Sequence, residues 1–265
     1  MFCPNCGKEV PDGAVTCSYC GASTPGVRPP LPERAEFSAT EVLGASLDII
    51  KKKPIILLPH IITTVIVTVP LFLIGVSLTS PARVASLESL VAVAASIIPI
   101  IIVAIIVGTI IEGMYPLMVK NVLEGKEVEM SAAFGKAVRR FPSLIVAGIL
   151  VGLLVIVGSA LFVIPGIIFL TWYYYTVPSI MLENRGALDG MSASKRFGRT
   201  RKWKTFLMLL VLIVIGIVGN AFNAIPVAGV VISTLIGIIV AVWGSIIPAY
   251  AYIKYAMPTQ TSPAP

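Results

Sequence analysis

The sequence predicts an all-α membrane protein with six transmembrane helices in three hairpins, preceded by a small N-terminal metal-binding module. Of the 265 residues, 57% are hydrophobic and 12% are charged, whereas about a quarter of the residues in ordinary globular domains are charged. A soluble core cannot bury that much apolar surface, so lipid is the expected solvent for most of the chain. All four cysteines lie within the first 20 residues, which confines the metal chemistry to that end.

The cysteine pattern is C-x2-C-x10-C-x2-C, formed by Cys3, Cys6, Cys17 and Cys20. Two residues between paired cysteines allow one tight turn to direct both sulfurs at a single metal. Four thiolates in a tetrahedral array favour Zn, with Fe as the alternative metal. Because thiolates fill all four positions, no place is left for a water or a substrate, and we expect a structural role. Two disulfides in an exported segment are the competing interpretation.

This spacing resembles the short zinc ribbon at the N-terminus of many prokaryotic membrane proteins, and the resemblance covers residues 1–22. A module of this size cannot build a hydrophobic core, so the bound metal would supply its folding energy. Lys8 is its single basic residue, and four thiolates around one zinc carry a net negative charge. Nucleic acid is therefore not an expected partner, and either contact with a cytoplasmic protein or simple capping of the chain is favoured.

The remaining domain boundaries follow from composition. Residues 23–36 hold four prolines and no apolar periodicity, which predicts a semi-extended linker. The predicted transmembrane domain occupies residues 37–257, and residues 258–265 are predicted to be a disordered tail. No cleavable secretory signal precedes the cysteines, so the apolar stretch that begins near Ile55 is the expected insertion signal.

Six apolar stretches have about the length that a tilted helix needs to cross a bilayer, roughly 20 residues. They are residues 55–77, 90–118, 143–163, 166–182, 205–223 and 227–253. The fourth is short, and the second and sixth are long. Short proline-containing breaks separate the third from the fourth and the fifth from the sixth, which predicts tight helical hairpins.

The basic residues lie almost entirely on one side of this predicted topology. Six of the 20 Lys and Arg residues occur up to Lys53, five in residues 120–140, seven in residues 185–204, and one is Lys254. Arg83 alone lies on the other side. The positive-inside rule therefore predicts a protein of the cell membrane with both termini in the cytoplasm. The net charge of +7 then indicates topology and contact with anionic lipid headgroups.

The same order of parts occurs three times: an amphipathic helix, a basic cluster and a membrane hairpin. The amphipathic helices are expected at residues 38–53, 131–141 and 187–199, and Ser38 and Ser131 are the expected N-caps of the first two. The second helix of each hairpin ends with a similarly placed proline: Pro116, Pro178 and Pro248. This pattern favours triplication of one unit whose amphipathic helix lies in the headgroup layer. The alternative is that any apolar hairpin with basic flanks looks repetitive.

The helical part resembles the membrane domain attached to some bacterial glycerophosphoryl diester phosphodiesterases. The residues that carry the resemblance are Val163-Ile164-Pro165-Gly166, Val177-Pro178, Leu182-Glu183, Ala187-Leu188, Ser194 and the basic run into Trp203. The resemblance covers residues 37–255 and implies a six-helix domain. The catalytic barrel is absent, because no soluble segment is long enough to form one. The activity of those enzymes therefore does not carry over.

Glu112 is the candidate for an intramembrane polar site, because it is the one acidic residue well inside a predicted span. About 12 Å of helix separates it from Lys120. It either binds a proton or cation, or is an interfacial carboxylate that reaches Lys120 or water. His60 is expected to be an interfacial residue. Gly148 and Gly152 form a G-x-x-x-G pattern, which predicts a close helix contact.

These observations favour a non-enzymatic membrane protein, since no convergent acid, base and nucleophile are evident. The leading hypothesis is a scaffold, lipid-responsive factor or accessory subunit that engages anionic headgroups and presents a zinc ribbon to a protein partner. The alternative is a transporter or channel with Glu112 in a polar path. An enzyme that acts on lipid is the least favoured class. The substrate, the partner and the oligomeric state are left open.

Overall fold

The computed structural model describes residues 6, 8, 9, 19, 36–78, 87–225 and 228–257 of the chain. The chain divides into two compact units, Met1–Glu36 and Phe37–Pro265. Most of the predicted linker, the predicted C-terminal tail and three of the four cysteines lie outside the described residues.

The second unit is helical. Its elements are α1 (Ala39–Lys52), a 3-10 turn η1 (Pro54–Leu57), α2 (Leu58–Leu78), α3 (Leu87–Leu123), α4 (Met130–Leu161), α5 (Val163–Tyr173), α6 (Thr176–Glu183), α7 (Ala187–Arg199), α8 (Lys202–Ala221), a 3-10 turn η3 (Phe222–Ala224) and α9 (Ala228–Ala256). Within the described ranges, six helical stretches are long and apolar enough to cross a membrane, with α5 and α6 together forming the fourth. The predicted all-α fold with six spans is confirmed.

The second amphipathic helix differs from the prediction. Residues 131–141 are the first turns of α4, which runs on without a break through Pro142 into the third span. Ser131 therefore lies inside the helix, and the N-cap is Glu129, whose side chain makes no cap hydrogen bond. A proline removes one backbone hydrogen bond from a helix but is tolerated in membrane helices, so α4 continues through Pro142. The Ser38 N-cap is confirmed: its hydroxyl accepts a hydrogen bond from the Glu41 amide at 3.3 Å.

The fourth span is interrupted between α5 and α6, and a side chain of α7 forms hydrogen bonds with the backbone at the interruption. The Ser194 hydroxyl of α7 accepts a hydrogen bond from the Tyr175 amide at 3.1 Å and donates one to the Trp172 carbonyl at 2.9 Å. In an uninterrupted helix these backbone groups would pair along the chain. One buried hydroxyl therefore provides partners for two backbone groups at the break, as a lipid-embedded helix requires.

Glycines at close contacts occur in α7, among other helices, and not at the predicted G-x-x-x-G pattern. A Cβ atom added at Gly198 would lie 2.7 Å from the Thr171 carbonyl oxygen, and one at Gly190 would lie 2.4 Å from an Ile180 side-chain carbon. At Gly148 and Gly152 an added Cβ would meet nothing within 4 Å. The prediction for Gly148 and Gly152 was wrong, because the pattern does not say which face of a helix meets a neighbour.

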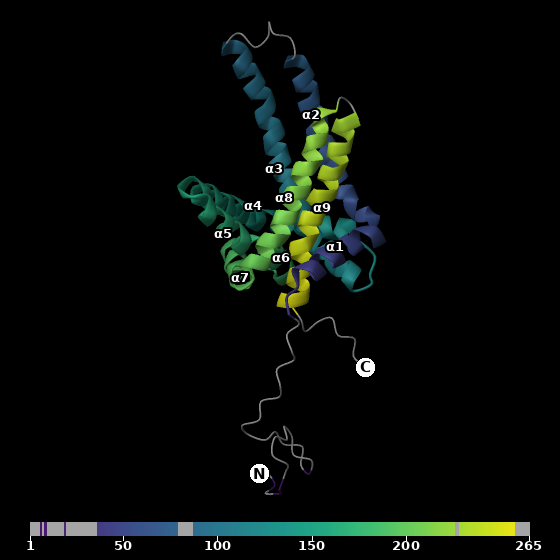
Figure 1. Ribbon diagram of the computed structural model, residues 1–265, viewed down its shortest axis with the longest axis vertical. Coiled ribbons are helices and arrows are strands. Elements are labelled where there is room, and N and C mark those ends of the chain that lie inside the picture. Colours follow the sequence, from purple (N-terminus) through teal and green to yellow (C-terminus); the bar gives the residue numbers. More distant parts are fainter. Residues whose placement is uncertain are drawn as a thin grey trace. The chain divides into compact units, whose positions relative to one another are not determined.

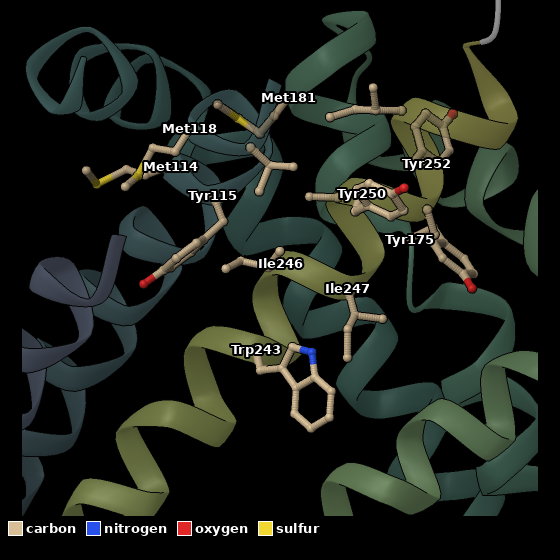
Figure 2. Packing of buried hydrophobic residues seen from close by; sticks show 14 of the residues in the cluster. Met114, Tyr115, Met118, Tyr175, Met181, Trp243, Ile246, Ile247, Tyr250 and Tyr252 are labelled. Atoms are coloured by element: carbon tan, nitrogen blue, oxygen red, sulfur yellow. The ribbon is translucent and has the colours of Figure 1, made fainter. Parts of the chain in front are cut away.

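The buried core surrounds Pro116, Pro178 and Pro248, the similarly placed prolines of the three hairpins. All three are buried. The residues two and three positions after each proline are also buried: Met118 and Val119, Ile180 and Met181, Tyr250 and Ala251. Figure 2 shows the resulting cluster, in which side chains of α3, the α5–α6 region and α9 pack around one centre. Many other large apolar side chains of the described spans are exposed, as expected of surfaces that face lipid.

Each amphipathic segment packs against the proline-containing span of the preceding unit. The first turns of α4 contact α3, where Ala137 lies near Gly113, and α7 contacts α5 and α6. The third contact joins the first unit to the last, because α1 packs on α9. There the Trp243 indole donates a hydrogen bond to the Ser46 hydroxyl at 3.1 Å. This cyclic arrangement is consistent with the predicted threefold repeat. The α4–α5 hairpin points away from the upright α3, α8 and α9 in Figure 1.

Polar contacts hold α1, α8 and α9 together at one end of the bundle. The Glu41 carboxylate accepts hydrogen bonds from Lys254 and, at 2.8 Å, from the Tyr255 hydroxyl. These bonds, that from Lys254 most of all, lower the pKa of Glu41, so its carboxylate stays charged at neutral pH. Lys204 at the start of α8 donates to the Phe37 carbonyl at 2.5 Å. The amphipathic helix and the basic ends of two spans therefore share one face of the membrane domain.

Candidate functional site

A cavity of about 290 Å³ lies among α3, α4, the α5–α6 region and α9. Its lining residues are Glu112, Pro116, Val151, Leu170, Tyr173, Tyr174, Val177, Pro178, Gly244, Ser245 and Pro248. The lining is mainly apolar, and the polar side chains are those of Glu112, Ser245 and the two tyrosines. Glu112, the predicted intramembrane polar residue, therefore borders a cavity.

All three units of the predicted repeat contribute the same pair of positions to this cavity. Each supplies its proline and the residue four positions earlier, which are Glu112 and Pro116, Tyr174 and Pro178, Gly244 and Pro248. Proline has no backbone N–H, so the carbonyl four residues before it loses its usual helical donor. The Gly244 carbonyl finds a substitute in the Tyr174 hydroxyl at 2.8 Å. The cavity thus lies beside one proline from each of the three units.

The Glu112 carboxylate uses one oxygen for its protein contacts. Oε1 accepts a hydrogen bond from the Ser245 hydroxyl at 2.9 Å and lies 3.8 Å from Nε2 of His60. The Glu112 side chain is 45% exposed, whereas that of His60 is 15% exposed. A distance of 3.8 Å is too long for a hydrogen bond, so the imidazole faces the carboxylate without being bonded to it.

His60 is held in place from its other side. Its Nδ1 lies 2.6 Å from the Tyr115 hydroxyl, which is also 3.2 Å from the Ile56 carbonyl. If Tyr115 donates to Ile56, the Nδ1–H of His60 donates to Tyr115; if Tyr115 donates to Nδ1, the proton of His60 is on Nε2 and faces Glu112. Tyr115 and His60 can therefore exchange proton positions without any movement of the backbone, and in one of the two arrangements the His60 proton faces Glu112.

This geometry corrects one expectation and adds to another. The interfacial position expected for His60 stays a prediction, and the structure adds that its side chain is mostly buried within the protein beside Glu112. Lys120 was a candidate partner for Glu112, yet it lies 3.7 Å from Glu124. Glu124 also accepts a 2.6 Å hydrogen bond from Lys126, which is the main reason that its pKa lies below the ordinary value. Neither Ser245 nor Tyr115 was singled out beforehand, because nothing local in the sequence connects either of them to Glu112.

A second hollow, of about 430 Å³, lies at the junction of α7 and α8. We call it the basic pocket, and its lining residues are Phe37, Arg199, Thr200, Arg201, Lys202, Trp203 and Lys204. Four of these seven side chains are cationic and none is acidic. The pocket lies within the predicted basic cluster of the third unit and next to the start of a membrane span.

Two of the four cations are held in place and two extend outward. The Arg201 guanidinium lies 4.2 Å from the centre of the Phe197 ring and donates to the Phe197 carbonyl at 3.1 Å. Lys204 is tied to the Phe37 carbonyl. Arg199 and Lys202 are exposed, as is the Trp203 ring at 71%. Exposed tryptophan and arginine at the end of a membrane span are typical of the headgroup layer.

The cysteines lie almost wholly outside the described residues. Cys6 is described and is exposed, whereas Cys3, Cys17 and Cys20 are not described. The donor set fits zinc, since four thiolates with two-residue spacing in each pair match a tetrahedral structural site. Elsewhere in the described part of the chain, no group of three or more His, Cys, Asp or Glu side chains could hold a metal ion.

Similarity to known proteins is found for the N-terminal unit alone. A zinc-ribbon domain model matches residues 2–24, which confirms the predicted zinc ribbon and with it zinc binding in general. No curated protein and no solved structure matches the chain. The predicted resemblance of the helical part to the phosphodiesterase membrane domain therefore has no support. The chain is a multi-pass membrane protein with an N-terminal zinc ribbon.

Proposed function

We propose that this protein is a non-enzymatic component of the cell membrane that binds anionic lipid headgroups and presents its zinc ribbon to a cytoplasmic protein. Both termini lie in the cytoplasm in this proposal, since 19 of the 20 Lys and Arg residues fall on the side that includes them. The observation that carries the proposal is the basic pocket, with Arg199, Arg201, Lys202 and Lys204 in its lining. Such pockets between cytoplasmic helix ends suit phosphate-containing headgroups.

The contacts of the basic pocket support a preference for lipid over a free anion. Arg201 and Lys204 are immobilised by the Phe197 and Phe37 carbonyls, which reduces the entropy lost when they bind a phosphate. The exposed Trp203 ring adjoins them and provides an apolar surface for the glycerol region of a lipid. Each Lys or Arg near an anionic bilayer contributes about 1 kcal/mol.

Removing the two exposed cations of the pocket should weaken binding of anionic lipid. We expect Arg199→Gln with Lys202→Gln to lose about 2 kcal/mol, or roughly 30-fold in affinity, for phosphatidylglycerol. The measurement is native mass spectrometry of the detergent-solubilised full chain, titrated with phosphatidylglycerol and, separately, with phosphatidylcholine.

The matched control removes the same charge from α7 outside the pocket. Lys195 and Arg196 are both exposed and do not line it, so Lys195→Gln with Arg196→Gln should bind phosphatidylglycerol nearly as well as the native chain. Equal losses in both double variants would show that net charge, and not the pocket, attracts the lipid. Equal binding of both lipids to the native chain would overturn the proposal.

Transport is a second candidate function, favoured by the cavity that Glu112 borders. The neighbouring His60 and Tyr115 can hold and pass a proton, which is the usual role of carboxylate and imidazole groups inside membrane transporters. In proteoliposomes that contain a pH-sensitive dye, we expect a potassium diffusion potential to drive proton flux through the native chain and much less through Glu112→Gln. Equal proton flux in both would remove this candidate.

A further inference from the structure

We propose that the cavity bordered by Glu112 is a binding site for a small organic ammonium ion with an apolar body. The inference concerns binding alone and rests on neither lipid binding nor transport. Its volume of about 290 Å³ is close to the lower end of the range of small-molecule pockets, roughly 300 Å³. The cavity therefore has room for a small amine.

The charge of the site selects a cation. Of the two carboxylate oxygens of Glu112, Oε1 contacts Ser245 and faces His60, whereas Oε2 has no polar partner among the residues that the structure describes. Within the described residues, no Lys or Arg side chain forms an ion pair with Glu112. A carboxylate inside a membrane span requires a counter-charge or a proton, and a bound ammonium group would provide the counter-charge.

The backbone near the prolines provides a further acceptor for an ammonium group. The Glu112 carbonyl has Pro116 four residues ahead and so lacks its usual helical donor, and Tyr174 lies at the break between α5 and α6. The equivalent carbonyl of Gly244 is already occupied by the Tyr174 hydroxyl. A backbone carbonyl without its helical donor is an acceptor that an ammonium group can use in addition to the carboxylate. Backbone carbonyls at interrupted membrane helices are a recurrent means of binding cations.

The rest of the lining favours an organic cation over a metal ion. Tyr173 and Tyr174 line the cavity, and aromatic faces attract ammonium groups. Val151, Leu170 and Val177 give the remaining wall an apolar surface, which a bare metal ion would leave without a contact. An organic anion would be repelled by Glu112.

The first experiment compares an amine with its neutral analogue. Equilibrium dialysis measures radiolabelled 2-phenylethylamine and 2-phenylethanol on the full chain in an uncharged maltoside detergent. We expect saturable binding of the amine to the native chain, at least a tenfold loss of its affinity in Glu112→Gln, and no such loss for the alcohol. Equal amine binding to both chains, or no saturable binding to the native chain, would overturn the proposal.

A pair of variants on one helix places the ligand in the cavity. Val151→Phe adds a ring at the cavity wall, whereas Val157→Phe makes the same change at an exposed position that does not line the cavity. We expect amine binding to fall at least fivefold in the first variant and to be unchanged in the second. Similar binding in the two variants would exclude the cavity as the site.

Two further readouts separate failure of the fold from failure of the proposal. Each variant is first required to show the native helical circular dichroism and a single size-exclusion peak. Phosphatidylglycerol binding should be unchanged in Glu112→Gln, because the basic pocket is a different site. Sodium that binds in a Glu112-dependent manner to a chain that does not bind the amine would assign the cavity to a metal cation and contradict the proposal.

Discussion

Cys6→Ser is expected to remove the zinc of the ribbon and to unfold that module, while the membrane domain keeps its stability. A four-thiolate site that loses one ligand loses much of a binding free energy of about 10–16 kcal/mol, which is also the folding free energy of so small a module. The second unit, Phe37–Pro265, is compact on its own. Elemental analysis should give one zinc per native chain and much less in the variant, and the thermal unfolding of the helical unit should be the same in both.

The thiol state separates zinc ligation from the competing disulfide interpretation. After zinc is removed with a chelator and without reductant, the native chain should react with four maleimide groups, since the chain contains four cysteines. Two disulfides would leave no reactive thiol and no zinc in the native chain. The matched control is Ser18→Ala, which alters a residue between two ligands and provides no sulfur, and which should retain its zinc.

Gly198→Ala is expected to destabilise the membrane domain by about 1–3 kcal/mol. The added Cβ would lie 2.7 Å from the Thr171 carbonyl oxygen and 2.9 Å from that of Trp172. Both are backbone atoms that cannot turn aside, so α7 must move away from α5. That movement also lengthens the two hydrogen bonds through which Ser194 bridges the break between α5 and α6. Thermal unfolding in detergent, followed by circular dichroism, measures the change.

Gly148→Ala is the matched control for this prediction. An added Cβ there meets nothing within 4 Å, and alanine favours a helix over glycine by about 1 kcal/mol. Its melting temperature should be equal to that of the native chain or slightly higher. If Gly148→Ala destabilised the domain as much as Gly198→Ala, the close contact would have to be at the G-x-x-x-G pattern after all.

The positions of the six membrane spans were predictable from the sequence, whereas the breaks and continuities between helices were less so. Hydropathy located the six spans because a lipid-embedded helix must be apolar along its whole length. The break between α5 and α6 was not foreseen, since it depends on Ser194 from another helix. The continuity of α4 through Pro142 was not foreseen either. Helices of soluble proteins usually end near a proline, whereas helices of a membrane bundle tolerate one.

The candidate sites divide in the same way. The basic run in residues 199–204 was visible as a cluster, and Glu112 stood out because an acidic residue is rare within a span. Their surroundings were hidden: His60 and Ser245 lie 52 and 133 positions from Glu112 along the chain. Nothing in the local pattern of either residue indicates that it faces this carboxylate.

The amino-acid sequence by itself determined that this chain resides in a membrane and carries a zinc ribbon, because hydropathy and ligand spacing are properties of short segments. It also indicated three similarly placed prolines. The tertiary structure alone decided that these prolines meet around one cavity, that His60 and Ser245 flank Glu112, and that Gly198 and not Gly148 lies at a close contact. Such pairings depend on which helix faces meet, and that is set by the packing of the whole bundle.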